Sequence, residues 1–218
     1  MLSFSEENYL KCIYHLSKDG KEEINTNAIA EHLNTKPASV TDMIRKLDKK
    51  GVITYKKYQG VSLSRQGLAE ALNVVRKHRL WEVFLVEKLK FNWDEVHDVA
   101  EQLEHIRSPL LIERLDKFLG SPQYDPHGDP IPDENGEFTS KNLIPVSAME
   151  VNDEGIVMAV KDTEVKFLQY LDKLGAYLGA KIKVVEKIEF DGSMEIIIDK
   201  KRTVFISKEV SNNILIAE

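Results

Sequence analysis

Apolar residues recur at helical spacing in the first fifty positions of the chain. Between Ser5 and Ser17 they predict an amphipathic helix with Ser5 as its N-cap, through Tyr9, Leu10, Ile13, Tyr14 and Leu16. A short helix is expected from Thr26, its cap, to Leu33, and a third helix from Pro37 to Lys50. Gly51 suits the end of that third helix. This succession predicts a helix-turn-helix.

The hydrophobic period changes immediately after the third helix. Residues 52–55 and 61–64 alternate as strands do, and the basic stretch 56–60 lies between them. A hairpin with a basic tip behind a helix-turn-helix predicts a winged helix. A purely structural three-helix unit is the alternative interpretation.

Three further helices are expected between residues 64 and 118. The first begins at Ser64, the second at Asp94 and the third at Ser108-Pro109. The third is apolar on more than one side, at Leu110, Leu111, Ile112, Leu115 and Phe118. Such a helix is typical of a dimer interface, although burial under the C-terminal segment would also explain it.

The last hundred residues predict a linker followed by a small β domain. Residues 120–145 are rich in Pro, Gly, Asp and Asn, so His127 is expected in solvent. Strands are expected at residues 155–160, 181–190, 194–199, 203–207 and 213–217, with a helix at 163–178. Together these elements predict a small barrel of about 65 residues.

The predicted fold class is therefore mainly α with a small β part. We expect a winged helix-turn-helix at residues 1–64, a helical metal-binding and dimerisation domain at 65–120, a Pro-rich linker at 121–149 and an SH3-like (FeoA-like) domain at 150–218.

The composition is that of an ordinary soluble globular protein. Of 218 residues, 42% are hydrophobic and 30% are charged, and no apolar run is long enough for a membrane span. The start of the chain lacks the basic and apolar regions of a secretory signal, so a cytoplasmic protein without a membrane partner is expected. The single cysteine, Cys12, excludes a disulfide framework and a thiolate zinc finger, and is expected to pack the first helix.

Charge is distributed unevenly along the chain. The net charge is -6, yet residues 36–65 carry eight basic and two acidic side chains, which is +6 for this stretch. Such a basic island predicts binding to DNA phosphates. The residues expected to face DNA are Lys36, Ala38, Ser39, Thr41, Asp42, Lys46, Lys56, Lys57, Tyr58 and Gln59. Asp42 is expected either to accept from a cytosine or to pair with Arg45 or Lys46.

Histidines and carboxylates gather between Arg76 and Ser108. His78 and Glu82 are four residues apart, and a second set falls at i, i+4, i+7 and i+8, namely His97, Glu101, Glu104 and His105. One face of a single helix is expected to carry this second set. Apolar neighbours are expected to turn both polar faces inward, where unpaired groups cost several kcal/mol, roughly, unless a cation is shared. A metal site is predicted, with a solvated helix face as the alternative.

Three stretches of the chain carry a family resemblance. At RKHRLWEVFL, WDEVHDVAEQLEH and HGDPIP the sequence resembles the iron- and manganese-dependent transcriptional repressors of bacteria, the diphtheria toxin repressor and manganese transport regulator family. The resemblance implies a homodimeric repressor, not an enzyme, that binds a palindromic double-stranded DNA operator. Mn²⁺ or Fe²⁺ would act as corepressor.

The resemblance also implies two metal sites. One would use Glu101, Glu104 and His105 with Asn8 of the first helix, and an ancillary site would use His78, Glu82, His97 and Glu164. Iron-type members have Cys in place of Glu101, so an oxygen ligand there favours a harder ion such as Mn²⁺. Asn8 replaces the Met or Asp of the family, and Lys11 stands where manganese-type members have another carboxylate.

Two other functions are weighed against this one. A winged-helix regulator that senses a small organic ligand would share the DNA-binding features, but would not need a metal. A metal-dependent hydrolase would use the same ligands to activate water, but the sequence supplies neither a separate base nor oxyanion donors.

Overall fold

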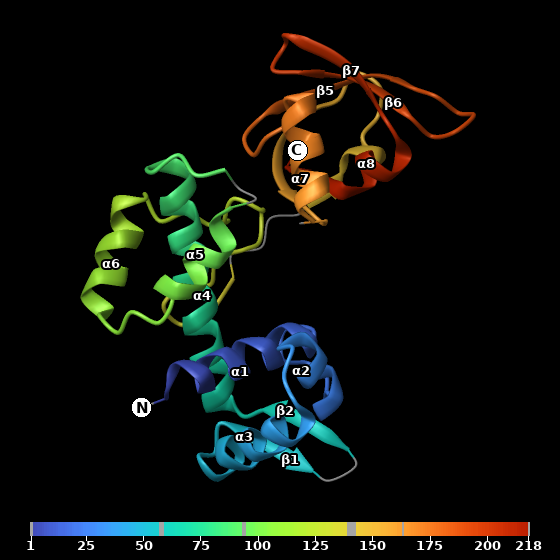
Figure 1. Cartoon of the computed structure of the whole chain (residues 1–218). Helices are drawn as coiled ribbons and strands as arrows, with labels where there is room; N and C mark the ends of the chain where they lie inside the picture. Colours follow the sequence, from blue (N-terminus) through green and yellow to red (C-terminus); the bar gives the residue numbers. More distant parts are fainter. Residues whose placement is uncertain (1, 57–58, 93–94, 139–142, 163, 218) are drawn as a thin grey trace. The chain divides into compact units, whose positions relative to one another are not determined.

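The computed structural model describes residues 2–56, 59–92, 95–138, 143–162 and 164–217 (Figure 1). They form two compact units, of which the first comprises residues 1–78, 102–108 and 132–137, and the second 79–101, 109–131 and 138–218. Helix α4 (Arg65–Glu87) runs from one unit into the other. None of the helices in the described part of the chain is long and apolar enough to cross a membrane.

The first unit contains the predicted helices and hairpin. Its elements are α1 (Phe4–Leu16), α2 (Thr26–His32), α3 (Pro37–Lys49), β1 (Ile53–Lys56), β2 (Gly60–Leu63) and the first part of α4. The two strands pair antiparallel, with Ile53 opposite Leu63. Pro37 occupies the first turn of α3, as predicted, because its missing N–H has no helical partner there.

The core of this unit is formed by one face of each helix together with the hairpin. The predicted apolar positions of α1 are confirmed, since Leu10 and Ile13 are fully buried and Tyr9 and Tyr14 nearly so. Cys12 is also in this core, at 2% exposed, and burial raises the pKa of its thiol to about 12. The thiol therefore packs α1, as predicted, and stays protonated at neutral pH.

The predicted caps of the first two helices are wrong by one or two residues. Ser3, not Ser5, caps α1, because Glu6 completes a capping box in which the Ser3 amide donates to Oε2 of Glu6 at 2.6 Å. Asn25, not Thr26, caps α2, and its Oδ1 accepts from the Ala28 amide at 2.8 Å. Both caps satisfy backbone amides that the helices leave without a partner.

Glu6 also links α1 to α3. Its carboxylate is 1% exposed, and its Oε1 lies 2.8 Å from Nζ of Lys50 and 3.1 Å from Nζ of Lys46. Burial alone would raise the pKa of Glu6, but hydrogen bonds from Lys50, the Ser3 amide and Lys46 outweigh it and lower the pKa to about 2. The ion pairs therefore hold the first turn of α1 against the last turns of α3.

One helix of the second unit, α5 (Val96–Leu103), ends earlier than the spacing predicted. The helices of this unit are the second part of α4, α5 and α6 (Pro109–Phe118). Because α5 ends at Leu103, the prediction of one helix face carrying all four polar groups is wrong. Glu104 and His105 follow α5 in a turn that belongs to the first unit, where Glu104 is buried in ion pairs. The Asp94 expected at the helix start lies outside the described residues.

The stretch predicted to be a solvated linker is partly buried. Asp125 and His127 are 4% and 9% exposed, so the expectation that His127 lies in solvent is wrong. The His127 carbonyl accepts from the Val160 amide at 2.9 Å. A Cβ on Gly128, whose φ is +88°, would lie 2.0 Å from Cα of Ala159, so only glycine fits there.

The C-terminal part forms a six-stranded antiparallel sheet in the order β3-β8-β4-β5-β6-β7. Its elements are β3 (Leu143–Pro145), η1 (Val146–Ala148), β4 (Glu154–Val160), α7 (Val165–Leu174), β5 (Lys181–Lys187), β6 (Met194–Ile198), β7 (Arg202–Ile206), α8 (Lys208–Asn213) and β8 (Ile214–Ala217). Helices α7 and α8 lie beside the sheet (Figure 1) and contribute Leu168, Leu171 and Val210 to its core.

The predicted barrel is not closed. A barrel requires hydrogen bonds between its first and last strands, whereas β3 and β7 lie at opposite ends of the sheet order. In the described part of the chain the sheet is therefore open. The sequence missed β3, which has only three residues, and α8, which has six.

We expect Glu6→Gln to lower the free energy of unfolding by about 2 kcal/mol at neutral pH, since an amide cannot form the two ion pairs. The pKa of Glu6 is about 2 in the folded protein against 4.5 for the free carboxyl. Its contribution is therefore complete at neutral pH and is lost as the pH falls from about 4.5 towards 2. Urea titrations at neutral and acidic pH measure this difference.

Glu22→Gln is the matched control, because Glu22 pairs with Lys18 on the surface, where both side chains are more than half exposed. A loss of stability in Glu6→Gln that is equally large at both ends of the pH range would contradict the ion-pair explanation.

Candidate metal centre

Helix α4 buries a run of polar side chains where an ordinary helix would bury apolar ones. Lys77, His78, Arg79 and Glu82 are all less than 9% exposed. Buried charges need partners, because leaving water costs each of them several kcal/mol, roughly. The partners define the candidate site.

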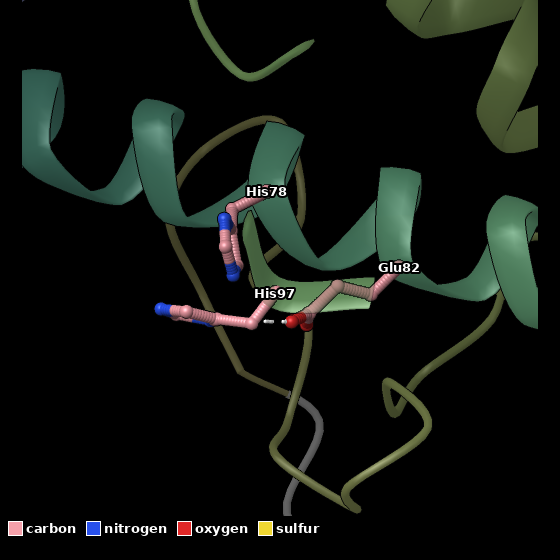
Figure 2. Close-up of side chains that lie close together, drawn as sticks. All are labelled: His78, Glu82 and His97. Carbon is pink, nitrogen blue, oxygen red and sulfur yellow. Dashed lines mark ion pairs between the residues drawn. The ribbon is translucent and has the colours of Figure 1, made fainter. Parts of the chain in front are cut away.

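The first group of possible ligands contains three of the four residues that the family resemblance implied for an ancillary site. Figure 2 shows His78 and Glu82 projecting from the same side of α4 toward His97 of α5, and their ligand atoms lie within 4.8 Å of one another. Nδ1 of His97 is 3.6 Å from Oε1 of Glu82, which is 2% exposed. The His97 side chain is 59% exposed, and its Nε2 lies 3.6 Å from Glu101. The α5 side of this group thus faces solvent, contrary to expectation.

A second group shares Glu82 but is fully buried. It joins Glu82 to Asp125 and His127, again with ligand atoms within 4.8 Å of one another. Nδ1 of His127 lies 3.8 Å from Oε1 of Glu82. Sequence reasoning missed Asp125 and His127 because the Pro- and Gly-rich composition indicated a linker. The HGDPIP stretch, which also carried the family resemblance, was the available signal.

Backbone hydrogen bonds hold this second group in place. Oδ1 of Asp125 accepts from the amides of His127 and Asp129, at 2.8 and 2.9 Å, which closes a tight loop. Nε of Arg79 lies 3.5 Å from Oδ2 of Asp125, and its Nη1 donates to the Pro130 carbonyl. The loop and α4 are thereby fixed around the ligand atoms.

The electrostatics of the second group favour a cation. Burial raises the pKa of Asp125 well above its ordinary value, and the nearby carboxylates of Glu82 and Asp129 raise it further, while Arg79 opposes them. A carboxyl group with such a raised pKa loses its proton more readily when a cation binds beside it. Divalent cations are bound by carboxylate oxygens and imidazole nitrogens.

Glu104, a predicted ligand, is buried in the first unit among other polar groups. Its Oε2 lies 2.6 Å from Nζ of Lys11 and 2.6 Å from Nδ1 of His78. Burial would raise the pKa of Glu104, but the hydrogen bond from His78 and the charge of Lys11 outweigh it and lower the pKa. Glu104 is therefore an anion with an ammonium partner.

His105, another predicted ligand, is held by the first turn of α1. Its Nδ1 lies 2.6 Å from Oε2 of Glu7, and its ring stacks on Phe4 with 4.7 Å between the centroids. Asn8, which the resemblance implied as the α1 ligand, has an exposed side chain. The sequence missed Glu7, which provides the α1 carboxylate at His105.

The remaining predicted ligands are placed differently. Glu101 is exposed in the second unit, where it pairs with His97. Glu164 is the exposed N-cap residue of α7 and belongs to neither three-residue group found among the described residues. The two groups contain oxygen and nitrogen donors without sulfur, since Cys12 lies in the core of the first unit.

The predicted DNA-facing residues are largely exposed. Exposed side chains in this set are Lys36, Ala38, Ser39, Asp42, Lys46, Lys56 and Gln59, while Lys57 and Tyr58 lie outside the described residues. Thr41 is half-buried and its hydroxyl donates to the Pro37 carbonyl. Asp42 lies 3.6 Å from Arg45, which supports the pairing alternative, and Lys46 is shared with Glu6.

Comparison with protein families matches three models along the chain. Residues 1–61 match the iron dependent repressor N-terminal DNA binding domain, and residues 64–133 match the iron dependent repressor metal binding and dimerisation domain. Residues 144–218 match the FeoA domain.

Individual proteins agree with these matches. An uncharacterized HTH-type transcriptional regulator of Methanocaldococcus jannaschii is 37% identical over 118 residues, which are 54% of this chain and 94% of that protein. The diphtheria toxin repressor of Corynebacterium diphtheriae is 28% identical over 187 residues, 84% of this chain and 82% of that protein.

A solved manganese-dependent transcriptional repressor in complex with manganese superimposes with a TM-score of 0.75 at 34% identity, covering 98% of this chain and 99% of the other. The chain therefore belongs to the iron-dependent repressor family, whose members are metal-dependent, DNA-binding transcriptional regulators.

Proposed function

We propose that this protein represses genes of metal-ion homeostasis, with Mn²⁺ or Fe²⁺ as corepressor, by binding a palindromic operator as a homodimer. The observation that carries this proposal is the buried group of Glu82, Asp125 and His127, whose possible ligand atoms lie within 4.8 Å of one another. Two carboxyl groups and an imidazole buried together match the donors that divalent ions such as Mn²⁺ prefer.

The residues of the centre divide into ligands and supports. Glu82, Asp125 and His127 are the proposed ligands of the buried group, and His78 and His97 extend it from α4 and α5. Arg79 orients Asp125 and the Pro130 carbonyl, as outer-shell partners do in other metal sites. The ion supplies positive charge that joins these segments when it binds.

The donor set favours a hard ion. Carboxylate oxygens suit Mn²⁺, whereas sites selective for softer metals use thiolates. The chain has one cysteine, and its thiol is buried in the core of the first unit. We therefore propose Mn²⁺ ahead of Fe²⁺ as the physiological ion. Glu101, Glu104 and His105 with Asn8 remain a predicted second site.

For DNA binding we propose that the first unit is a winged helix. Helix α3 follows α2 after a short turn, as the recognition helix of a helix-turn-helix does, and the β1–β2 hairpin serves as the wing. The proposed domains are those of the sequence analysis, namely 1–64, 65–120, 121–149 and 150–218. Exposed Leu110, Leu111 and Phe118 on α6 support a dimer interface.

The alternative functions differ in whether DNA binding depends on a metal ion. A regulator that senses an organic ligand keeps its affinity for DNA after chelation, whereas the proposed repressor loses it. The family match does not favour a hydrolase, since its members are transcriptional repressors. Binding to a DNA selected from a random pool in the presence of Mn²⁺, measured by fluorescence anisotropy before and after EDTA, separates the two regulators.

We expect His127→Ala and Asp125→Asn to weaken Mn²⁺ binding by about 100-fold, because each removes a donor from the buried group. Isothermal titration of Mn²⁺ into the metal-free protein measures this loss. His32→Ala is the control, since His32 is exposed on α2 of the first unit. Unchanged affinity in both variants, with the fold preserved by circular dichroism, would rule out this group as the metal centre.

His105→Ala tests the predicted second site. If His105 is a ligand there, the variant requires more Mn²⁺ than the wild type for half-maximal DNA binding in a mobility-shift titration. An identical Mn²⁺ requirement would mean that His105 serves only to hold the first turn of α1 through Glu7.

For the recognition surface, we expect Lys36→Ala to weaken DNA binding for all sequences and to reduce the salt dependence by about one unit of slope, as the loss of one phosphate contact does. Lys36 is exposed at the start of α3. Lys21→Ala removes an exposed lysine outside the basic island and serves as control. Equal salt slopes for the two variants would place the phosphate contacts elsewhere.

A further inference from the structure

A buried ammonium group lies against the carboxylate of Glu104 in the first unit. Lys11 of α1 is 8% exposed, and its Nζ lies 2.6 Å from Oε2 of Glu104, which is itself 1% exposed. The same Nζ is 3.1 Å from Nδ1 of His78. Lysine is seldom buried to this degree unless an anion compensates its charge.

The three groups can be assigned one set of hydrogen bonds. Oε2 of Glu104 is 2.6 Å from Nδ1 of His78, and a carboxylate only accepts, so Nδ1 carries the proton. Because Nδ1 carries a proton, it cannot also accept a hydrogen bond from Lys11. Of Glu104 and His78, the Lys11 ammonium therefore donates only to Glu104.

The charges of this cluster are already balanced. The ammonium of Lys11 and the carboxylate of Glu104 cancel. A divalent ion bound to Oε2 of Glu104 would add two positive charges close to a buried ammonium. Repulsion between such charges is poorly screened away from water.

We propose that Lys11 is the internal counterion of Glu104, occupying the place that a divalent metal would need in order to use Glu104 and His78 together. The inference rests on the proposed function, because it concerns how many ions the same metal-sensing protein accepts. It assigns metal binding primarily to the groups around Glu82. It also means that α1 is held to residues 102–108 in the metal-free protein.

The first test measures stability without metal. We expect Lys11→Met to lower the thermal midpoint of the EDTA-treated protein by several degrees, because it leaves the Glu104 carboxylate buried without its cation. The double variant Lys11→Met/Glu104→Gln removes both charges and should recover most of this loss. Lys21→Met is the control, since Lys21 is an exposed lysine outside the Lys11–Glu104 pair, and it should leave the thermal midpoint unchanged.

The second test counts metal ions. We expect Lys11→Glu to bind one more Mn²⁺ per subunit than the wild type, since a carboxylate at this position would join Glu104 as an oxygen donor beside His78. Mass spectrometry of the metal content after gel filtration measures the count. Lys21→Glu makes the same change of charge on the surface and should leave the count unchanged.

The outcomes separate this inference from the proposed function. A wild type that binds no Mn²⁺ contradicts the proposed function, whereas the stability cycle still tests the Lys11–Glu104 pair. A wild type that binds Mn²⁺, together with a Lys11→Met variant as stable as the wild type without metal, overturns the inference. An unchanged metal count in a folded Lys11→Glu variant overturns it as well.

Discussion

Burial of carboxylates is the constraint on which this structure depends. Glu6, Glu82 and Glu104 are each at most 2% exposed, and an ionised carboxylate that leaves water needs positive charge close by. The three carboxylates differ in the groups that lie close to them. Glu6 has two lysines at the end of α3, Glu104 has Lys11 of its own unit, and Glu82 lies close to the buried Asp125 and His127. The third environment is the one in which we propose the metal site.

The first turn of α1 connects the parts of the first unit that matter for regulation. Consecutive residues serve different partners, since Glu6 contacts Lys46 and Lys50 of α3 while Glu7 contacts His105. A displacement of this turn therefore acts on α3, the proposed recognition helix, and on a predicted ligand together. The lysines shared with Glu6 are also less available to phosphates than their exposure suggests. The effective basic surface of α3 is thus smaller than the charge count of the sequence implies.

The sequence predicted what depends on near neighbours. Periodicity located α1, α3 and the hairpin, because burial of one face imposes a spacing on residues that are close in the chain. Periodicity did not predict the position of residues whose contacts are with residues remote in the sequence. Glu104 lies in the turn after α5, where its partner is Lys11, 93 positions away. His127 looked solvated because composition cannot reveal that Glu82 of α4 lies 3.8 Å away. Closure of the sheet likewise depends on the pairing of strands that are remote in sequence, so the open edge was not predicted.

The buried thiol on α1 has a consequence of a different kind. Cys12 is the only cysteine of the chain, and its pKa of about 12 keeps it unreactive while α1 remains packed. Alkylating reagents therefore modify the protein only when this helix detaches from the core. The rate at which the Cys12 thiol is alkylated therefore reports how often α1, which also carries Glu6 and Lys11, opens locally. No probe has to be introduced for this measurement.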